Sequence, residues 1–284
     1  MKNEKLVTWL FETNAIRVCE DNRPFWYTSG AIGPYYINTH FLYGSEQKAN
    51  LLLKLIDETK EDKMSCPIKI LNAVKENYET DNIYHSLMDE LISFIKDNID
   101  INEIDYISGG ERRDWFFSLL AADMLKKPHI TIYKDMDMVI YQDENVTKAE
   151  SLQGCNVLHI ADLLNEASSY AKMWVPAVSG KGGKIKWSIV IVDRKQGGEE
   201  LLRENGIIPL SMIGIDKDTF EKAEKLGHIN KQQHEMIKKY IENPRESMRN
   251  FLLSHPKFLE ESLKADSKTA ARAKLCIDNN IYGL

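Results

Sequence analysis

The pattern of apolar residues predicts alternating strands and helices in the middle of the chain and mainly helices toward both ends. Between residues 104 and 212, short apolar runs of strand length alternate with segments whose apolar residues recur at helical spacing. The predicted strands are 104–107, 129–133, 157–160, 185–192 and 207–212, and the predicted helices are 112–126, 168–178 and 196–205. This order is typical of an α/β fold with a mostly parallel, Rossmann-like sheet flanked by helices.

The segments outside this alternating region are predicted to be mainly helical. The predicted helices are 3–20, 46–60 and 82–98 before it, and 217–227, 231–242, 245–254 and 267–280 after it. Residues 61–82 are polar and irregular, with room for a short helix. We therefore expect an N-terminal helix and hood region (1–62), an α/β core (63–215) and a C-terminal helical extension (216–284).

The N-terminal segment that begins at Phe25 is rich in aromatic residues, glycine and proline, which predicts short strands joined by turns at Ser29-Gly30 and Gly33-Pro34. Its aromatic residues are Phe25, Trp26, Tyr27, Tyr35 and Tyr36. They form either a small local core or a lid that stacks on a planar ligand. The sequence leaves both interpretations open.

The stretch Asn156 to Tyr170 is the strongest candidate for a binding site. A short apolar run leads to Asp162, with a bend expected after Ile160, and a helical pattern starts near Ser168. In open α/β sheets, ligands bind at such corners, where free N–H groups at a helix start attract anions. The segments 108–117, with a tight turn at Gly109-Gly110, and 189–198 have the same strand–turn–helix character.

The polar residues of this stretch also have purely structural interpretations. Asp162, Ser168 and Ser169 are residue types that cap helices. His159 lies inside the apolar strand, where a hydrogen-bonded core histidine is more common than a ligand-binding one.

The composition is that of an ordinary globular protein, with 43% hydrophobic and 28% charged residues. A net charge of −6 argues against bulk attraction to nucleic acid. The four cysteines are scattered without a CxxC motif, which argues against a zinc site and a disulfide framework. The charged N-terminus is unlike a signal peptide, and no apolar run reaches the roughly 18 residues of a membrane helix. We expect a cytoplasmic protein without membrane or nucleic-acid partners.

Five motifs, taken in order, resemble those of the type I phosphoribosyltransferases, most closely orotate phosphoribosyltransferase, over about residues 5–215. YTSGAIGPYYIN resembles the family's substrate hood, and SGGERRDWFF its pyrophosphate-contacting turn. ITIYKD resembles the strand that ends in an Arg-Lys pair, and VLHIADLLNEASS the phosphoribosyl-diphosphate motif. VDRKQGGEELLRENGI resembles the Asp-Arg segment with its following helix, and is the closest match.

The resemblance implies a homodimeric transferase of nucleotide metabolism. It would displace diphosphate from phosphoribosyl diphosphate by a ring nitrogen of a pyrimidine-type base, with a Mg²⁺ ion bridging substrate oxygens. The implied catalytic residues are Asp162 and Lys134, and the implied phosphate-binding residues are Asn165, Glu166, Ala167, Ser168 and Ser169. The implied diphosphate-binding residues are Gly109, Gly110, Arg112 and Arg113, and the implied base-binding residues are Arg194, Tyr35, Tyr36 and Ser29. No protein residue is assigned as a metal ligand.

The chain departs from the family pattern at the phosphate loop. Ala161 replaces the first of the family's two adjacent acids. Asn165 and Glu166 replace the two threonines of the loop, and Ala167 and Ser168 replace its two glycines. A Glu166 carboxylate about 4 Å from a phosphate would cost about 1–4 kcal/mol, unless it points to solvent or binds a cation. Tyr133 replaces the arginine of the Arg-Lys pair.

The segment after Lys134 departs as well. Residues 135–146 contain four acids and no base, where the family has a basic mobile loop. This segment is either a hairpin around 138–141 or a mobile loop. These departures leave two alternatives to an active transferase: a non-catalytic module that binds a nucleotide or another anion, and an interaction protein that docks a partner on its helical extension.

Overall fold

The computed structural model describes residues 2–20 and 23–284, which form two compact units. The first comprises Met1–Ala15 and Thr39–Ile215, and the second comprises Ile16–Asn38 and Asp216–Leu284. The hood segment is therefore grouped with the C-terminal helices, whereas the sequence division placed it with residues 1–62.

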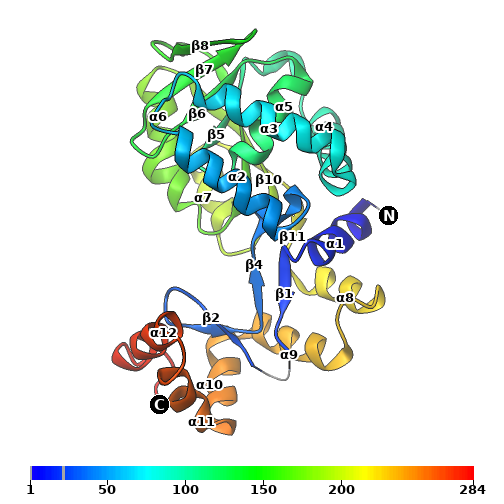
Figure 1. The fold of residues 1–284 in the computed structure, drawn as a ribbon, viewed down its shortest axis with the longest axis vertical. Coiled ribbons are helices and arrows are strands. Elements are labelled where there is room, and N and C mark those ends of the chain that lie inside the picture. Colours follow the sequence, from blue (N-terminus) through cyan, green and yellow to red (C-terminus); the bar gives the residue numbers. More distant parts are fainter. Residues whose placement is uncertain (1, 21–22) are drawn as a thin grey trace. The chain divides into compact units, whose positions relative to one another are not determined.

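The first unit is built on a seven-stranded sheet with the strand order β11-β10-β9-β5-β6-β7-β8 (Figure 1). The strands are β5 Tyr106–Gly110, β6 His129–Ile132, β7 Met138–Gln142, β8 Asn145–Lys148, β9 Asn156–Leu164, β10 Lys184–Asp193 and β11 Ile208–Gly214. Neighbours from β11 to β6 pair in parallel, and β7 and β8 add an antiparallel hairpin at the edge. The predicted α/β fold class is confirmed, and the hairpin alternative for 138–141 is the correct one.

The connections of this sheet run in opposite directions from its centre. From β5 the chain crosses to β6 on one side, and from β9 it crosses to β10 and then β11 on the other. Because such crossovers are right-handed, helix α5 Trp115–Leu125 covers one face, while α6 Val175–Gly180 and α7 Gly198–Glu204 cover the opposite face (Figure 1). The point between β5 and β9 where the direction reverses is where open α/β sheets bind ligands.

Three further helices pack outside α5, namely α2 Glu46–Thr59, α3 Cys66–Thr80 and α4 Asn82–Asn98. Helix α5 is thus enclosed between the sheet and the outer helices. This position accounts for its apolar residues on all sides. The N-terminal helix α1 Lys2–Glu12 contacts β11.

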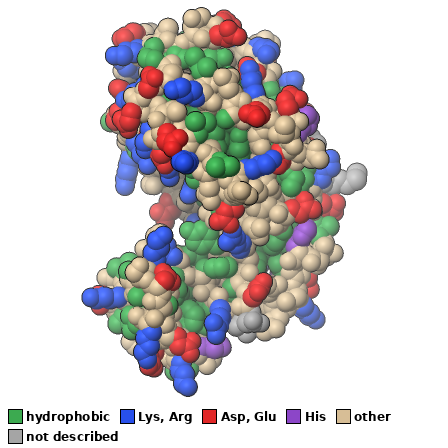
Figure 2. Space-filling view, in the orientation of Figure 1, with side chains coloured by type: hydrophobic (Ala, Val, Ile, Leu, Met, Phe, Trp, Pro, Cys, Tyr) green, Lys and Arg blue, Asp and Glu red, His purple; other side chains and the backbone are tan. Residues whose placement is uncertain are grey.

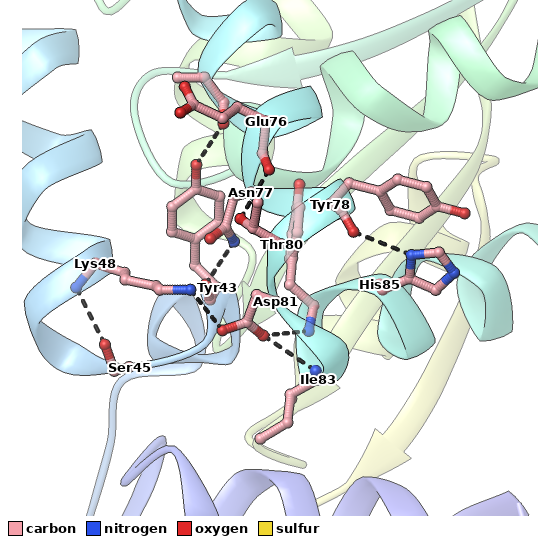
Figure 3. Close-up of polar contacts among 12 residues, drawn as sticks. Tyr43, Ser45, Lys48, Glu76, Asn77, Tyr78, Thr80, Asp81, Ile83 and His85 are labelled. Atoms are coloured by element: carbon pink, nitrogen blue, oxygen red, sulfur yellow. Dashed lines mark hydrogen bonds and ion pairs between the residues drawn. The ribbon is translucent and has the colours of Figure 1, made fainter.

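A polar junction joins the outer helices (Figure 3). We call Tyr43, Gly44, Lys48, Asn77 and Asp81 the α2–α4 junction. The Asp81 carboxylate accepts hydrogen bonds from the backbone N–H groups of Ile83 (3.0 Å) and Tyr84 (2.9 Å), and its other oxygen lies 2.8 Å from Lys48 Nζ. Asn77 Nδ2 donates to the Tyr43 carbonyl at 2.7 Å. Asp81 thus caps α4 and ties it to α2.

The second unit combines two short strand pairs with five helices. Strand β1 Ile16–Val18 pairs with β4 Tyr35–Ile37, and β2 Phe25–Trp26 pairs with β3 Ile32–Gly33. The helices are α8 Lys217–Lys225, α9 Lys231–Glu242, α10 Pro244–Ser254, α11 Lys257–Leu263 and α12 Ser267–Asp278.

The hood aromatic residues take part in the core of this second unit. Trp26 stacks on Phe258 with ring centroids 5.7 Å apart, and its Nε1 donates to Ser262 Oγ at 3.1 Å. Tyr35 packs against Phe220 and Tyr240, with centroids 5.0 and 5.7 Å away. For Trp26 and Tyr35 the core interpretation is confirmed, although the core is made with the C-terminal helices and is not purely local.

Several predicted boundaries were wrong. The N-terminal helix ends at Glu12, because Asn14 has φ +57° and the chain continues as a strand. Residues 61–82 contain the fifteen-residue helix α3, and α11 was not predicted. Gly109 and Gly110 lie in strand β5 and do not form a tight turn.

Within the part of the chain that the structure describes, no helix has the length and apolar character required to cross a membrane. On the face seen in Figure 2, acidic and basic side chains are interspersed over both units.

Candidate active site

A cavity of about 290 Å³ opens at the switch point of the sheet. Three segments at the carboxyl ends of strands line it: Glu111–Asp114 after β5, Lys134 after β6, and residues of the last part of β9 and beyond. The last group is Ala161, Asp162, Leu163, Leu164, Asn165, Ala167, Ser168, Ser169, Tyr170 and Trp174. The structure therefore brings together most of the phosphate- and diphosphate-binding residues that the sequence predicted.

Strand β9 continues past the predicted bend after Ile160, which was wrong. Leu163 and Leu164 stay in register with Val192 and Asp193 of β10, so Asp162 lies within the strand and does not cap a helix. The turn comes later, at Asn165–Ala167, where Ala167 has φ +54°. This left-handed conformation favours glycine, the residue that the family pattern has here.

Asp162 is the central acid of the cavity. Its side chain is buried, with 7% of the residue exposed, and Oδ2 makes no hydrogen bond with any described residue. Burial and the negative charge of Asp114 raise the pKa of Asp162 to about 7, against the opposing effect of the Arg113 charge. A buried polar atom without a partner is costly, which suggests that this oxygen serves a ligand.

Asp114 is a second acid of the cavity, and the sequence reasoning missed it. Its Oδ1 accepts from the Asp162 backbone N–H at 3.1 Å, and its Oδ2 accepts from the Gly110 N–H at 2.9 Å. Asp114 therefore joins the end of β5 to the end of β9. The sequence signal for it is an acid shortly after the glycine pair, but the helix predicted over 112–126 made Asp114 an ordinary residue of a first helical turn.

His159 lies behind this acid. It is fully buried, its Nδ1 is 2.9 Å from Ser108 Oγ, and its Nε2 is 3.5 Å from Asp114 Oδ2. Tyr170 and Trp174 pack against its ring. The prediction of a core histidine is confirmed.

The three basic residues of the cavity differ in their pairing. Arg112 pairs with Asp57 of α2. The side chains of Arg113 and Lys134 are exposed, and neither forms an ion pair with a described residue. Two unpaired cations thus face the cavity, which suits an anionic ligand.

The residues of the predicted phosphate loop lie only partly along the cavity, and their phosphate-binding role stays a prediction. Asn165, Ala167, Ser168 and Ser169 line the cavity, whereas Glu166 is exposed and does not. Ser169 precedes the short π-helical turn Tyr170–Trp174, and its hydroxyl makes no capping hydrogen bond there. Its hydroxyl is therefore not used as a cap.

The glycines of β5 allow close packing at the cavity edge. A Cβ on Gly109 would lie 2.2 Å from Ser118 Oγ, and one on Gly110 would lie 2.2 Å from the Trp174 ring. Both positions thus require glycine, because α5 and the turn Tyr170–Trp174 pack directly against the strand there. Neither glycine is a lining residue of the cavity, so their diphosphate-binding role stays a prediction.

The predicted base-binding residues belong to different units. Ser29, Tyr35 and Tyr36 lie in the second unit and Arg194 lies in the first, so their common role stays a prediction. Arg194 is half-buried at the end of β10, and its Nε makes no hydrogen bond with any described residue. The neighbouring Asp193 pairs with Lys195, whose Nζ lies 3.0 Å from its carboxylate.

The described residues contain no group of three or more His, Cys, Asp or Glu side chains arranged to hold a metal. Mg²⁺ commonly keeps several waters and binds through one or two carboxylates plus substrate phosphates. The carboxylates of Asp114 and Asp162 fit such a substrate-held ion.

No known protein-family model matches the chain. An orotate phosphoribosyltransferase of Sulfurisphaera tokodaii is 25% identical over 158 residues, which cover 56% of this chain and 78% of that protein.

Two solved structures show the same fold. The UMP synthase of Leishmania donovani has a TM-score of 0.54 at 15% identity, over 84% of this chain and 42% of that one, so the chain spans less than half of its length. The orotate phosphoribosyltransferase of Francisella tularensis has a TM-score of 0.51 at 14% identity, over 82% of this chain and 96% of that one. The resemblance drawn from the motifs is thereby confirmed: the chain has the type I phosphoribosyltransferase fold and is similar in sequence to an orotate phosphoribosyltransferase.

Proposed function

We propose that the chain binds phosphoribosyl diphosphate in this cavity and transfers the phosphoribosyl group to a pyrimidine-type base. One observation carries the proposal: a cavity at the switch point combines the buried, unpartnered oxygen of Asp162 with the unpaired cations Arg113 and Lys134. A ligand with hydroxyls at one end and phosphates at the other would satisfy both features.

In the proposed reaction, a ring nitrogen attacks C1 of the ribose. The C1–N bond forms while the C1–O bond breaks, its electron pair leaves with diphosphate, and the proton of the ring N–H passes to solvent. Arg113 and Lys134 would stabilise the negative charge that grows on the departing diphosphate. Asp162 would accept a hydrogen bond from a ribose hydroxyl, and the Asn165, Ser168 and Ser169 side chains with nearby amides would bind the 5-phosphate. A bound Mg²⁺ would neutralise part of the diphosphate charge.

A second candidate is a non-catalytic binding module that uses the same cavity. Ala161 favours this candidate, because an alanine stands where the resembled motif has an acid. Ala161 is 3% exposed and packs in an apolar cluster with Ala167 and Trp174. The candidate is also favoured by the β7–β8 hairpin, since residues 135–146 add no cation to the site. Such a module would bind a nucleotide or another anion without turning it over.

Thermal melting with phosphoribosyl diphosphate and Mg²⁺, combined with an absorbance assay of orotate consumption, separates the candidates. A higher melting temperature with orotate consumption supports the transferase, and a higher temperature without consumption supports the module. The absence of both contradicts the transferase and a module for phosphoribosyl diphosphate, and leaves only a module that binds another anion. The double variant Arg113→Gln/Lys134→Gln should abolish the shift, whereas Lys148→Gln, on the edge strand β8, serves as a control for lost charge.

The cytoplasmic location, the homodimer and the choice of base stay predictions. Light scattering on the purified protein would test the oligomeric state. Arg194→Gln would test the predicted contact between Arg194 and the carboxylate of orotate. Loss of this contact should raise the KM for orotate and leave the affinity for phosphoribosyl diphosphate unchanged.

A further inference from the structure

Asp114 occupies the N-cap position of α5 but does not cap that helix. Its side chain makes no capping hydrogen bond, although aspartate is among the best N-cap residues. Both carboxylate oxygens turn instead toward the ends of β5 and β9. The acid is therefore placed for something other than helix stability.

The position of Asp114 beside Asp162 creates a pair of carboxyl groups in the cavity. Asp114 lines the cavity, and 11% of its side chain is exposed. A carboxylate offers about four lone-pair sites, and the two backbone N–H groups use only two of them. The remaining sites can accept hydrogen bonds from a ligand.

Ala161 explains why a second acid matters here. In the motif that this chain resembles, the residue before Asp162 is acidic, and in this chain it is an alanine that packs in the apolar cluster. A vicinal diol presents two hydroxyl donors, and acidic side chains are the usual acceptors for ribose hydroxyls. Asp162 and Asp114, which both line the cavity, together offer each hydroxyl its own carboxyl group.

We propose that Asp114 supplies the second carboxylate of the ribose site, taking over from β5 the role that Ala161 cannot fill on β9. The ligand class is a ribose phosphate with free 2- and 3-hydroxyls. This inference rests on the proposed function, because it assigns the orientation of the same ligand in the same cavity.

The backbone N–H groups of Gly110 and Asp162 hold the Asp114 carboxylate in this orientation, and buried side chains pack behind it. His159 Nε2 lies 3.5 Å from Oδ2, and Ser108 fixes the other ring nitrogen. Trp174, which covers Gly110 and lies over the His159 ring, closes the site on that side. The carboxylate is thus anchored on one side and open to the cavity on the other.

The test is calorimetric titration of the full chain with ribose 5-phosphate and, separately, with inorganic diphosphate. Asp114→Asn should weaken ribose 5-phosphate at least tenfold, because an amide cannot replace a charged acceptor, and should change diphosphate affinity less than threefold. Asp123→Asn is the matched control, since Asp123 lies on the same helix and pairs with Lys75 on the surface. This control should alter neither affinity.

The rescue variant Asp114→Asn/Ala161→Asp returns an acid to β9 and should recover at least threefold of the lost ribose 5-phosphate affinity. If Asp114 only ties β5 to β9, both ligands weaken together, and that result overturns the inference. Unchanged ribose 5-phosphate binding in Asp114→Asn also overturns it, while the proposed function survives. If the native chain binds neither ligand, the proposed function fails and this inference fails with it. If the double variant does not melt cooperatively, the comparison of the two ligands in Asp114→Asn still decides.

Discussion

Two aspartates in the first unit, Asp81 and Asp162, show how a structural acid differs from one that faces a ligand. At the α2–α4 junction, Asp81 accepts two backbone hydrogen bonds and pairs with Lys48 (Figure 3). In the cavity, Asp162 is also buried, yet its Oδ2 has no partner among the described residues. Native proteins satisfy nearly all buried polar atoms, and Asp162 Oδ2 is one of six described side-chain atoms that depart from this rule. Of these six carboxylate, hydroxyl and nitrogen atoms, it is the one on which the proposed ligand site depends.

The largest expected effect is at the satisfied acid. A Cβ on Gly44 would lie 2.1 Å from Asp81 Oδ2, and Gly44 has φ +117°. Gly44→Ala should lower the free energy of unfolding by about 3 kcal/mol, as backbone strain adds to the loss of the Asp81 cap. Urea denaturation measures this change. Gly154→Ala is the control, because Gly154 has φ +74° but open space around it, and a loss as large as that of Gly44→Ala would show that strain alone matters.

At Asp162, whose Oδ2 has no partner among the described residues, replacement should raise the free energy of unfolding and not lower it. The pKa of Asp162 is about 7 in the folded protein and near 3.8 in the unfolded chain, so the folded state binds the extra proton between these values. Stability is then lost as the pH rises from about 4 to 7, by at most about 4 kcal/mol. Asp162→Asn should therefore raise the free energy of unfolding by about 2 kcal/mol at pH 8, with little gain at pH 4.

Asp81→Asn provides the matched comparison, since it removes the charge that pairs with Lys48 and should lower stability by about 0.5–1 kcal/mol. Urea denaturation of both variants at pH 4, 6 and 8 gives the two trends. Equal losses in the two variants at pH 8 would show that Asp162 is as well satisfied as Asp81.

The two adjacent arginines extend the comparison to ligand binding. Arg112 is paired with Asp57, whereas Arg113 forms no ion pair with a described residue. Arg113→Gln should weaken inorganic diphosphate binding about tenfold, or about 1.4 kcal/mol, and Arg112→Gln less than threefold, because its charge is already neutralised. Calorimetry at low and high salt measures both, and the Arg113 effect should shrink at high salt. A larger loss in Arg112→Gln would reverse the assignment.

The sequence predicts an element well when the residues that determine it lie within one segment, and poorly when it depends on contacts with distant segments. Helix α4 was predicted over its full length, because Asp81 and the apolar residues Leu87 and Leu91 belong to the same segment. For residues 61–82 the sequence allowed only a short helix, whereas α3 has fifteen residues and begins with Pro67 in its first turn, where proline is favoured.

The candidate site follows the same rule. The sequence placed the strand that carries Asp162 and the cations of the cavity, because these motifs are contiguous. It could not predict Asp114, whose role depends on a hydrogen bond to the distant backbone of Asp162. It also could not predict that Tyr35 packs on Phe220 and Tyr240, which come much later in the chain.

The smallest expected effect is at Glu166, which the sequence placed near a phosphate. An acid about 4 Å from the phosphate would weaken binding by about 1–4 kcal/mol, so its replacement should tighten binding strongly. In the structure Glu166 is exposed and does not line the cavity, so solvent and salt screen its charge. Glu166→Thr should therefore change the calorimetric affinity for ribose 5-phosphate less than twofold, whereas Asn165→Ala, a change of a lining residue, should weaken it severalfold. A tenfold gain in Glu166→Thr would mean that the loop turns inward when it binds a phosphate, and that the satisfied and unsatisfied regions are less separate than Asp81 and Asp162 suggest.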